Sequence, residues 1–181
     1  PVDAADMYGE LQFDPAGFGE TAHLIGSPRT GAKVFGLSEE AVQAIVSGMN
    51  AGFLPADSPN TPPADAFRHA IWNYKMARDL GYATAKRFAD GHEISSPNDD
   101  GERLKDLYNN EVGRQLAADT ANHDRTDDEV IREALESGKL KITPFNVVGS
   151  VARLGLRNRI YEDETYQEGR GDTSQQLKRL R

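Results

Sequence analysis

The sequence contains no cysteine among its 181 residues. This absence excludes disulfides, thiolate zinc sites and cysteine nucleophiles. Long apolar runs are missing too, since none approaches the roughly 18 residues that a membrane-spanning helix needs. The chain begins at Pro1 and shows no charged and then apolar secretion signal. We therefore expect no transmembrane segment in it, and we expect it to be a piece of a longer polypeptide.

The chain also has fewer basic than acidic residues. The chain has 21 Lys and Arg against 29 Asp and Glu, which gives a formal net charge of −8. Proteins that bind long nucleic acids usually carry a basic stripe, so extended nucleic acid is not an expected partner, although a compact nuclease pocket remains open. The motifs of serine esterases, nucleotide triphosphatases and H-E-x-x-H zinc peptidases are also absent.

Hydrophobic periodicity and capping residues predict a mainly α, compact helical domain of about five to six helices, with at most a short strand or hairpin. The helices are expected at residues 38–49, 65–80, 82–92, 102–119 and 126–135. Ser38 is the predicted N-cap of the first, and Thr126 with Glu129 predicts a capping box for the last. A short strand is expected at 139–142 and one further helix at 145–161.

The composition divides the chain into three parts. Residues 1–36 are rich in Gly, Pro and acidic residues and are expected to form a lead-in or linker. Residues 37–161 are expected to form the helical domain that carries the chemistry. Residues 162–181 are polar and poor in apolar side chains, which predicts a flexible tail.

The segment DAFRHAIWNYKMARDLG, at 65–81, carries large apolar residues on both faces of a helix. This pattern predicts a helix that is buried nearly all round, together with Asp65 and His69. Burial of an ionisable group costs several kcal/mol unless the group is paired or ligates a metal. Asp65 and His69 stand four residues apart, which is near enough for them to pair. The structural alternative is that Asp65 only caps the helix and that His69 is a core histidine whose hydrogen bonds are satisfied.

A second polar segment is FADGHE, at 88–93. His92 shares a helical face with Ala85, Phe88 and Ala89, and Glu93 follows it. His92 is therefore expected to point in the same direction as the packing residues. A histidine favoured by the dipole at a helix C-terminus is the alternative.

A third polar segment is DLYNNEVGR, at 106–114. Asp106, Asn109, Asn110 and Gly113 fall on one helical face. Asparagine is a poor helix former, and glycine costs roughly 1 kcal/mol relative to alanine within a helix. A helix that gives up local stability in this way often serves a function. Gly113 would let another backbone come close, which would bring Asp106 and Asn110 against the helix that holds His69.

Together the three segments predict one shared buried site. The expected catalytic residues are His69, His92, Arg68, Asn109, Asn110 and Arg114, and the expected metal ligands are Asp65, Glu93 and Asp106. Carboxylate, imidazole and amide groups suit a divalent ion such as Ca²⁺, Mg²⁺ or Zn²⁺. Imidazole beside carboxylate also suits acid–base catalysis without a metal. The arginines suit an anionic substrate such as a phosphoester.

The same three motifs resemble those of an uncharacterised bacterial domain family with the pattern D-A-F-R-H-A-x-W, then A-H-E, then D-x-x-N-N-x-x-G-R. The resemblance covers about residues 60–142, and its pattern points to the residues already named. Members occur at the C-terminal ends of secreted, wall-associated and polymorphic-toxin-like proteins. The resemblance implies an effector or toxin module within a larger secreted polypeptide, delivered into a target bacterial cell and neutralised in the producer by an immunity protein.

These observations lead us to expect an antibacterial effector that hydrolyses a phosphoester of the cell envelope with the help of a metal and that does not bind extended nucleic acid. The acidic chain favours a lipid-linked cell-wall precursor or a phospholipid, with the periplasm as the place of action. A metal-dependent nuclease toxin is one alternative. A non-enzymatic helical binding module, whose polar residues form a structural network, is the other.

Overall fold

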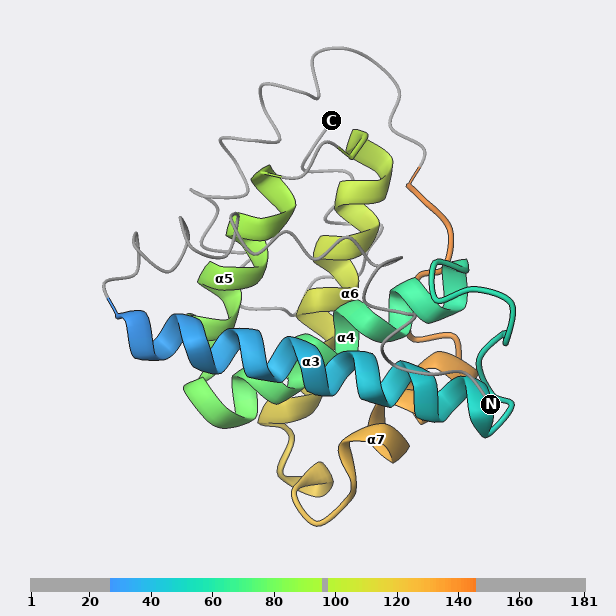
Figure 1. Ribbon diagram of the computed structural model, residues 1–181, viewed down its shortest axis with the longest axis horizontal. Helices are drawn as coiled ribbons and strands as arrows, with labels where there is room; N and C mark the ends of the chain where they lie inside the picture. Colours follow the sequence, from blue (N-terminus) through green and yellow to red (C-terminus); the bar gives the residue numbers. More distant parts are fainter. Residues whose placement is uncertain (1–26, 96–97, 146–181) are drawn as a thin grey trace.

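The computed structural model describes residues 27–95 and 98–145, which form a helical domain (Figure 1). Its helices are α3 (Pro28–Asn50), α4 (Pro62–Leu80), α5 (Tyr82–Ser95), α6 (Asp100–Ala118) and α7 (Asp127–Glu136), with a 3₁₀ turn at Thr120–Asn122. The predicted mainly α fold is confirmed. None of the helices in these residues is long and apolar enough to cross a membrane.

Helix α4 is the centre of the fold and packs against α3, α5, α6 and α7. In Figure 1, α3 crosses in front of it, α5 and α6 stand beside each other on one side, and α7 lies on the other. Its apolar residues on both faces are buried, among them Phe67 and Ile71 on one face and Trp72 and Met76 on the other. The predicted burial of this helix nearly all round is therefore confirmed, and it carries His69 into the interior.

Helix α3 begins ten residues earlier than its sequence suggests. Ser27 is the N-cap, its side chain accepts a hydrogen bond from the Thr30 amide, and Pro28 takes the first helical position, where proline is tolerated. The prediction of Ser38 as the N-cap was wrong, because its hydroxyl donates to the Phe35 carbonyl at 2.6 Å within the helix. Residues 28–36, which were expected in the lead-in, are thus helical.

Helix α6 approaches α4 closely at Gly113. A Cβ atom on this residue would lie 2.9 Å from the carbonyl carbon of Ala70 and closer still to its oxygen. The predicted close approach of another backbone is confirmed, and that backbone belongs to the helix that holds His69. Contact at this point lets α6 present Asp106 and Asn110 to α4.

The segment after α7 packs along α6. The Thr126–Glu129 capping box that begins α7 is present as predicted. The strand predicted at 139–142 was wrong, since the described residues contain no strand there. Instead the Asn109 side chain donates to the Lys141 carbonyl at 2.8 Å and accepts from its amide at 2.9 Å, which satisfies the backbone without a partner strand. The helix predicted at 145–161 and the tail at 162–181 lie almost entirely outside the described residues.

Candidate metal and catalytic site

Helices α4, α5 and α6 enclose a cavity of about 330 Å³. Its charged and imidazole lining includes Asp65, Arg68 and His69 from α4, His92 and Glu93 from α5, and Lys105 and Asp106 from α6. Ile142 and Pro144, from the segment after α7, form part of its edge. The three helices thus bring together six of the residues predicted from the sequence.

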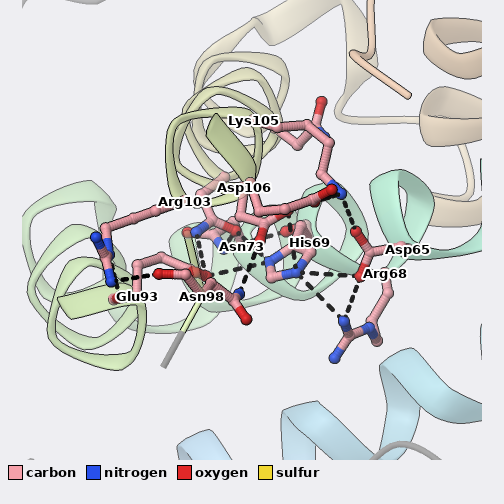
Figure 2. A network of polar contacts seen from close by, with 12 residues as sticks. Asp65, Arg68, His69, Asn73, Glu93, Asn98, Arg103, Lys105 and Asp106 are labelled. Carbon is pink, nitrogen blue, oxygen red and sulfur yellow. Dashed lines mark hydrogen bonds and ion pairs between the residues drawn. The ribbon is translucent and has the colours of Figure 1, made fainter. Parts of the chain in front are cut away.

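His69 is the residue on which the carboxylates converge (Figure 2). Its Nε2 atom lies 3.4 Å from Oδ1 of Asp65 and 3.6 Å from Oδ1 of Asp106. On the other side of the ring, Nδ1 lies 3.3 Å from Oε1 of Glu93 and 3.3 Å from Oδ1 of Asn110. The two ring nitrogens therefore face different partners, and the ring is 5% exposed.

Asp65, His69 and Asp106 each offer one ligand atom, and the three atoms lie within 4.8 Å of one another. The Oδ1 atom of Asp106 is buried and accepts no hydrogen bond from the described residues. Two carboxylates with one imidazole, and an oxygen without a donor, fit a divalent ion with mixed oxygen and nitrogen ligands. The group could therefore hold such an ion.

Glu93, which the sequence suggested as a metal ligand, lies on the opposite side of the ring from this group. It contacts Nδ1 of His69, and its Oε1 accepts a hydrogen bond from Nδ2 of Asn110 at 3.2 Å. Carboxylates placed in this way orient a ligating histidine and make it a stronger ligand. The candidate metal group therefore contains His69, which was predicted as a catalytic residue, in place of Glu93, which was predicted as a ligand.

The two aspartates of the metal group have different electrostatic surroundings. Burial would raise the pKa of Asp65, but His69, Arg68 and Lys105 hold this pKa well below its usual range. Burial raises the pKa of Asp106 to about 6, and while His69 opposes this shift, Glu93 and Asp65 add to it. Of these two aspartates, Asp106 is therefore the one whose negative charge is less well stabilised by the surrounding side chains.

The two histidines also differ. Burial would lower the pKa of His69, but Asp106, Glu93 and Asp65 raise it to about 10, so its ring is protonated at neutral pH. Burial lowers the pKa of His92 below its ordinary value, with His69 and Arg68 contributing. His92 packs edge-on against Trp72, with ring centroids 5.8 Å apart. A neutral imidazole in the cavity wall suits a general base, whereas protonated His69 does not.

Three predicted catalytic residues, Asn109, Asn110 and Arg114, lie outside the cavity lining. Asn109 binds the backbone of Lys141, as described above. Arg114 has no exposed surface, and it donates to Oε2 of Glu111 through Nε at 3.1 Å and Nη2 at 2.8 Å. Through these contacts, Asn109 holds the segment after α7 against α6, and Arg114 forms a buried ion pair within α6.

Asn110, also predicted as catalytic, lies behind His69. Its Oδ1 accepts a hydrogen bond from Nδ2 of Asn73 at 2.6 Å, and Nη1 of Arg114 donates to Oδ1 of Asn73 at 2.7 Å. A chain of buried hydrogen bonds therefore runs from Arg114 through Asn73 and Asn110 to His69. Such a chain holds the ring in one orientation.

The sequence did not indicate Lys105 or Asn98 as parts of the site. Lys105 is buried, and its Nζ lies 2.7 Å from Oδ2 of Asp65, while Nδ2 of Asn98 donates to Oδ2 of Asp106 at 3.4 Å. Lys105 stands three residues after Glu102, which is the usual spacing of an exposed ion pair on a helix. Nothing in that pattern distinguishes a buried lysine from a solvated one.

We predict that, with a chelator present, the free energy of unfolding falls as the pH rises from neutral towards 10. His69 binds its proton more tightly in the folded state, where its pKa is about 10, than in the unfolded state, where it is about 6.5. Its stabilising contribution is complete below about pH 6.5 and is lost as the pH rises through about 10. Urea unfolding of the wild type and of His69→Gln across this range measures the effect. The variant should lack most of the fall, and equal slopes would contradict the prediction.

A family model described as a domain of unknown function, DUF6973, matches residues 24–139. The matched range contains all the cavity residues of α4, α5 and α6. No curated protein and no solved structure matches the chain.

Proposed function

Since the chain belongs to the DUF6973 family, a family of unknown function, we propose from the chemistry of its cavity that it is a metal-assisted hydrolase of phosphoesters. The observation that carries this proposal is the group formed by Asp65, His69 and Asp106, which lies in a cavity that also presents Arg68 and Lys105. A place for a divalent ion beside two cations is the combination that phosphoryl chemistry needs.

In this proposal the residues in and behind the cavity wall have different roles. Arg68 and Lys105 bind the oxygens of the anionic substrate. His92, which burial keeps neutral, takes a proton from the attacking water. Glu93 and Asn110 hold the His69 ring through Nδ1, so that Nε2 faces Asp65 and Asp106. A divalent ion, when bound, polarises a phosphoryl oxygen and lowers the pKa of a bound water.

We further propose that the domain is an antibacterial effector, delivered as part of a larger secreted protein, that acts on the cell envelope of the target. The motifs that resemble toxin-like proteins support this context, and a neutralising immunity protein would then accompany it. The net charge of −8 disfavours long nucleic acids and supports a phospholipid or lipid-linked cell-wall precursor as the substrate.

We predict that Asp106→Asn abolishes hydrolysis while the fold is kept. The substitution removes a charged ligand, and changes to residues that only support metal ligands already lower affinity by about 10–100-fold. Stability should be unchanged or higher, because burial and the neighbouring carboxylates already raise the pKa of Asp106 to about 6. Mn²⁺ affinity by calorimetry, phosphate-ester release from phospholipid vesicles, and unfolding in urea measure the three effects.

The matched control is Asp79→Asn, because Asp79 lies on the exposed end of the same helix as Asp65, paired with Lys33. This variant should bind Mn²⁺ and hydrolyse ester as the wild type does. Expression of the wild type in the periplasm and in the cytoplasm then identifies the substrate. Lysis only after export supports the envelope substrate, whereas degraded DNA or RNA after cytoplasmic expression would replace it with the nuclease alternative. Full activity of Asp106→Asn would refute the role of the metal group.

A further inference from the structure

Asp65 is shared by two cations in the wall of the cavity (Figure 2). Arg68 binds its Oδ1 atom, and Nζ of Lys105 lies 2.7 Å from its Oδ2 atom, so the cations approach from opposite sides. The side chains of Arg68 and Lys105 are only 17% and 6% exposed. Both line the cavity, yet in this arrangement their charge is directed to a carboxylate of the protein itself.

Arg68 occupies the place that a divalent ion would need. Its Nη2 atom binds Oδ1 of Asp65 and lies 3.3 Å from Nε2 of His69. Asp65 and His69 are two of the three members of the candidate metal group. An ion ligated by both Oδ1 of Asp65 and Nε2 of His69 would lie beside the two atoms that Nη2 of Arg68 now contacts, and it would repel the guanidinium, so its entry displaces the Arg68 donor.

Lys105 is held by the same group of carboxylates. Its Nζ atom lies 3.4 Å from Oδ1 of Asp106, the third member of the metal group, and also pairs with Glu102 at the edge of the cavity. An ion bound to Oδ1 of Asp106 neutralises charge on this carboxylate, although the oxygen itself accepts no hydrogen bond from Lys105. Entry of the ion therefore weakens the hold of the carboxylates on the lysine, whose side chain lines the cavity.

We propose that Arg68 and Lys105 form a subsite for a tetrahedral oxyanion, and that this subsite becomes available only after a divalent ion has bound Asp65. The inference rests on the proposed function, because it uses the same metal group, and it adds an order of binding. Coupling of this kind is reciprocal, so the anion strengthens binding of the ion by the same factor.

Calorimetric titration of the full chain with sulfate, in the presence and absence of saturating Mn²⁺, tests this proposal. Sulfate is a tetrahedral anion that the enzyme cannot hydrolyse, so the measurement reports binding alone. We expect sulfate to bind about tenfold or more tightly with Mn²⁺ present, within the usual range of coupling between sites. Equal sulfate affinity under the two conditions, or tighter binding without Mn²⁺, would overturn the inference.

Lys105→Gln should still bind Mn²⁺ but lose most of the gain in sulfate affinity. Arg68→Gln, at a less buried position, should do the same and carries the test if circular dichroism shows that Lys105→Gln does not fold. Lys33→Gln, at an exposed lysine of α3, is the matched control and should keep the full gain. Unchanged coupling in the folded cavity variants would overturn the inference. Mn²⁺ binding without coupling would do so as well and leave the metal group standing, whereas failure to bind Mn²⁺ at all would refute that group.

Discussion

Gly113→Ala is expected to destabilise the domain by about 3 kcal/mol or more, which is large for a change of one methyl group. The added Cβ would lie 2.9 Å from the carbonyl carbon of Ala70 and closer to its oxygen. This obstacle is backbone in the buried middle of α4, so a rotamer change cannot relieve it. The two helices must separate, and the contacts of Asp106 and Asn110 with His69 depend on their separation.

Urea unfolding measures the loss of stability, and Mn²⁺ titration of the folded fraction should show weaker binding. Gly36→Ala is the matched control, because Gly36 also lies within a helix but has nothing within 4 Å of its would-be Cβ. That substitution should stabilise the protein by up to about 1 kcal/mol, since alanine is the better helix former. If both variants had the same stability, the close contact between α4 and α6 would be refuted.

Arg114→Met is expected to cost about 3–5 kcal/mol, the usual effect of removing one partner of a buried ion pair. Arg114 is fully buried and Glu111 is 5% exposed, so methionine would leave a carboxylate in the interior without its cation. The hydroxyl of Tyr82 and the amide of Gln115 would still donate to Glu111, at 2.7 and 2.9 Å. Neither supplies a positive charge.

The double variant Arg114→Met with Glu111→Gln should recover most of this stability, because the amide removes the unmatched charge and keeps its hydrogen bonds. Arg132→Met, at an exposed arginine of α7, is the control and should change stability by less than about 1 kcal/mol. Chemical denaturation of the four proteins measures these differences. A stable Arg114→Met variant without hydrolytic activity would instead return Arg114 to the substrate contact that the sequence suggested.

The sequence was most informative about features that depend on residues within a single helix. The pattern of apolar residues in 65–81 requires a helix buried on both faces, and the structure buries it in that way. Gly113 indicated a close backbone approach, because a glycine in the middle of a helix costs stability that a neighbouring element must offset. The Thr126–Glu129 capping box followed from short-range spacing alone.

Predictions that depended on contacts between distant segments were less complete. Arg114 was expected in the site, yet its guanidinium binds Glu111 one turn earlier instead of facing the cavity. Lys105 has the spacing of an ordinary surface ion pair with Glu102, and only the approach of α4 places Asp65 beside it and removes it from water. The start of α3 was misplaced because packing on α4 outweighs the weak helical propensity of its glycines.

The sequence by itself determined the helical class, the burial of α4 and the segments from which the polar groups come, because each of these depends on periodicity and capping within one stretch of chain. Only the tertiary structure decided which ring nitrogen of His69 faces which carboxylate, and which cations share Asp65. Those contacts depend on the crossing of α4, α5 and α6 to within a fraction of an ångström, and the spacing of residues along a single helix does not contain that information.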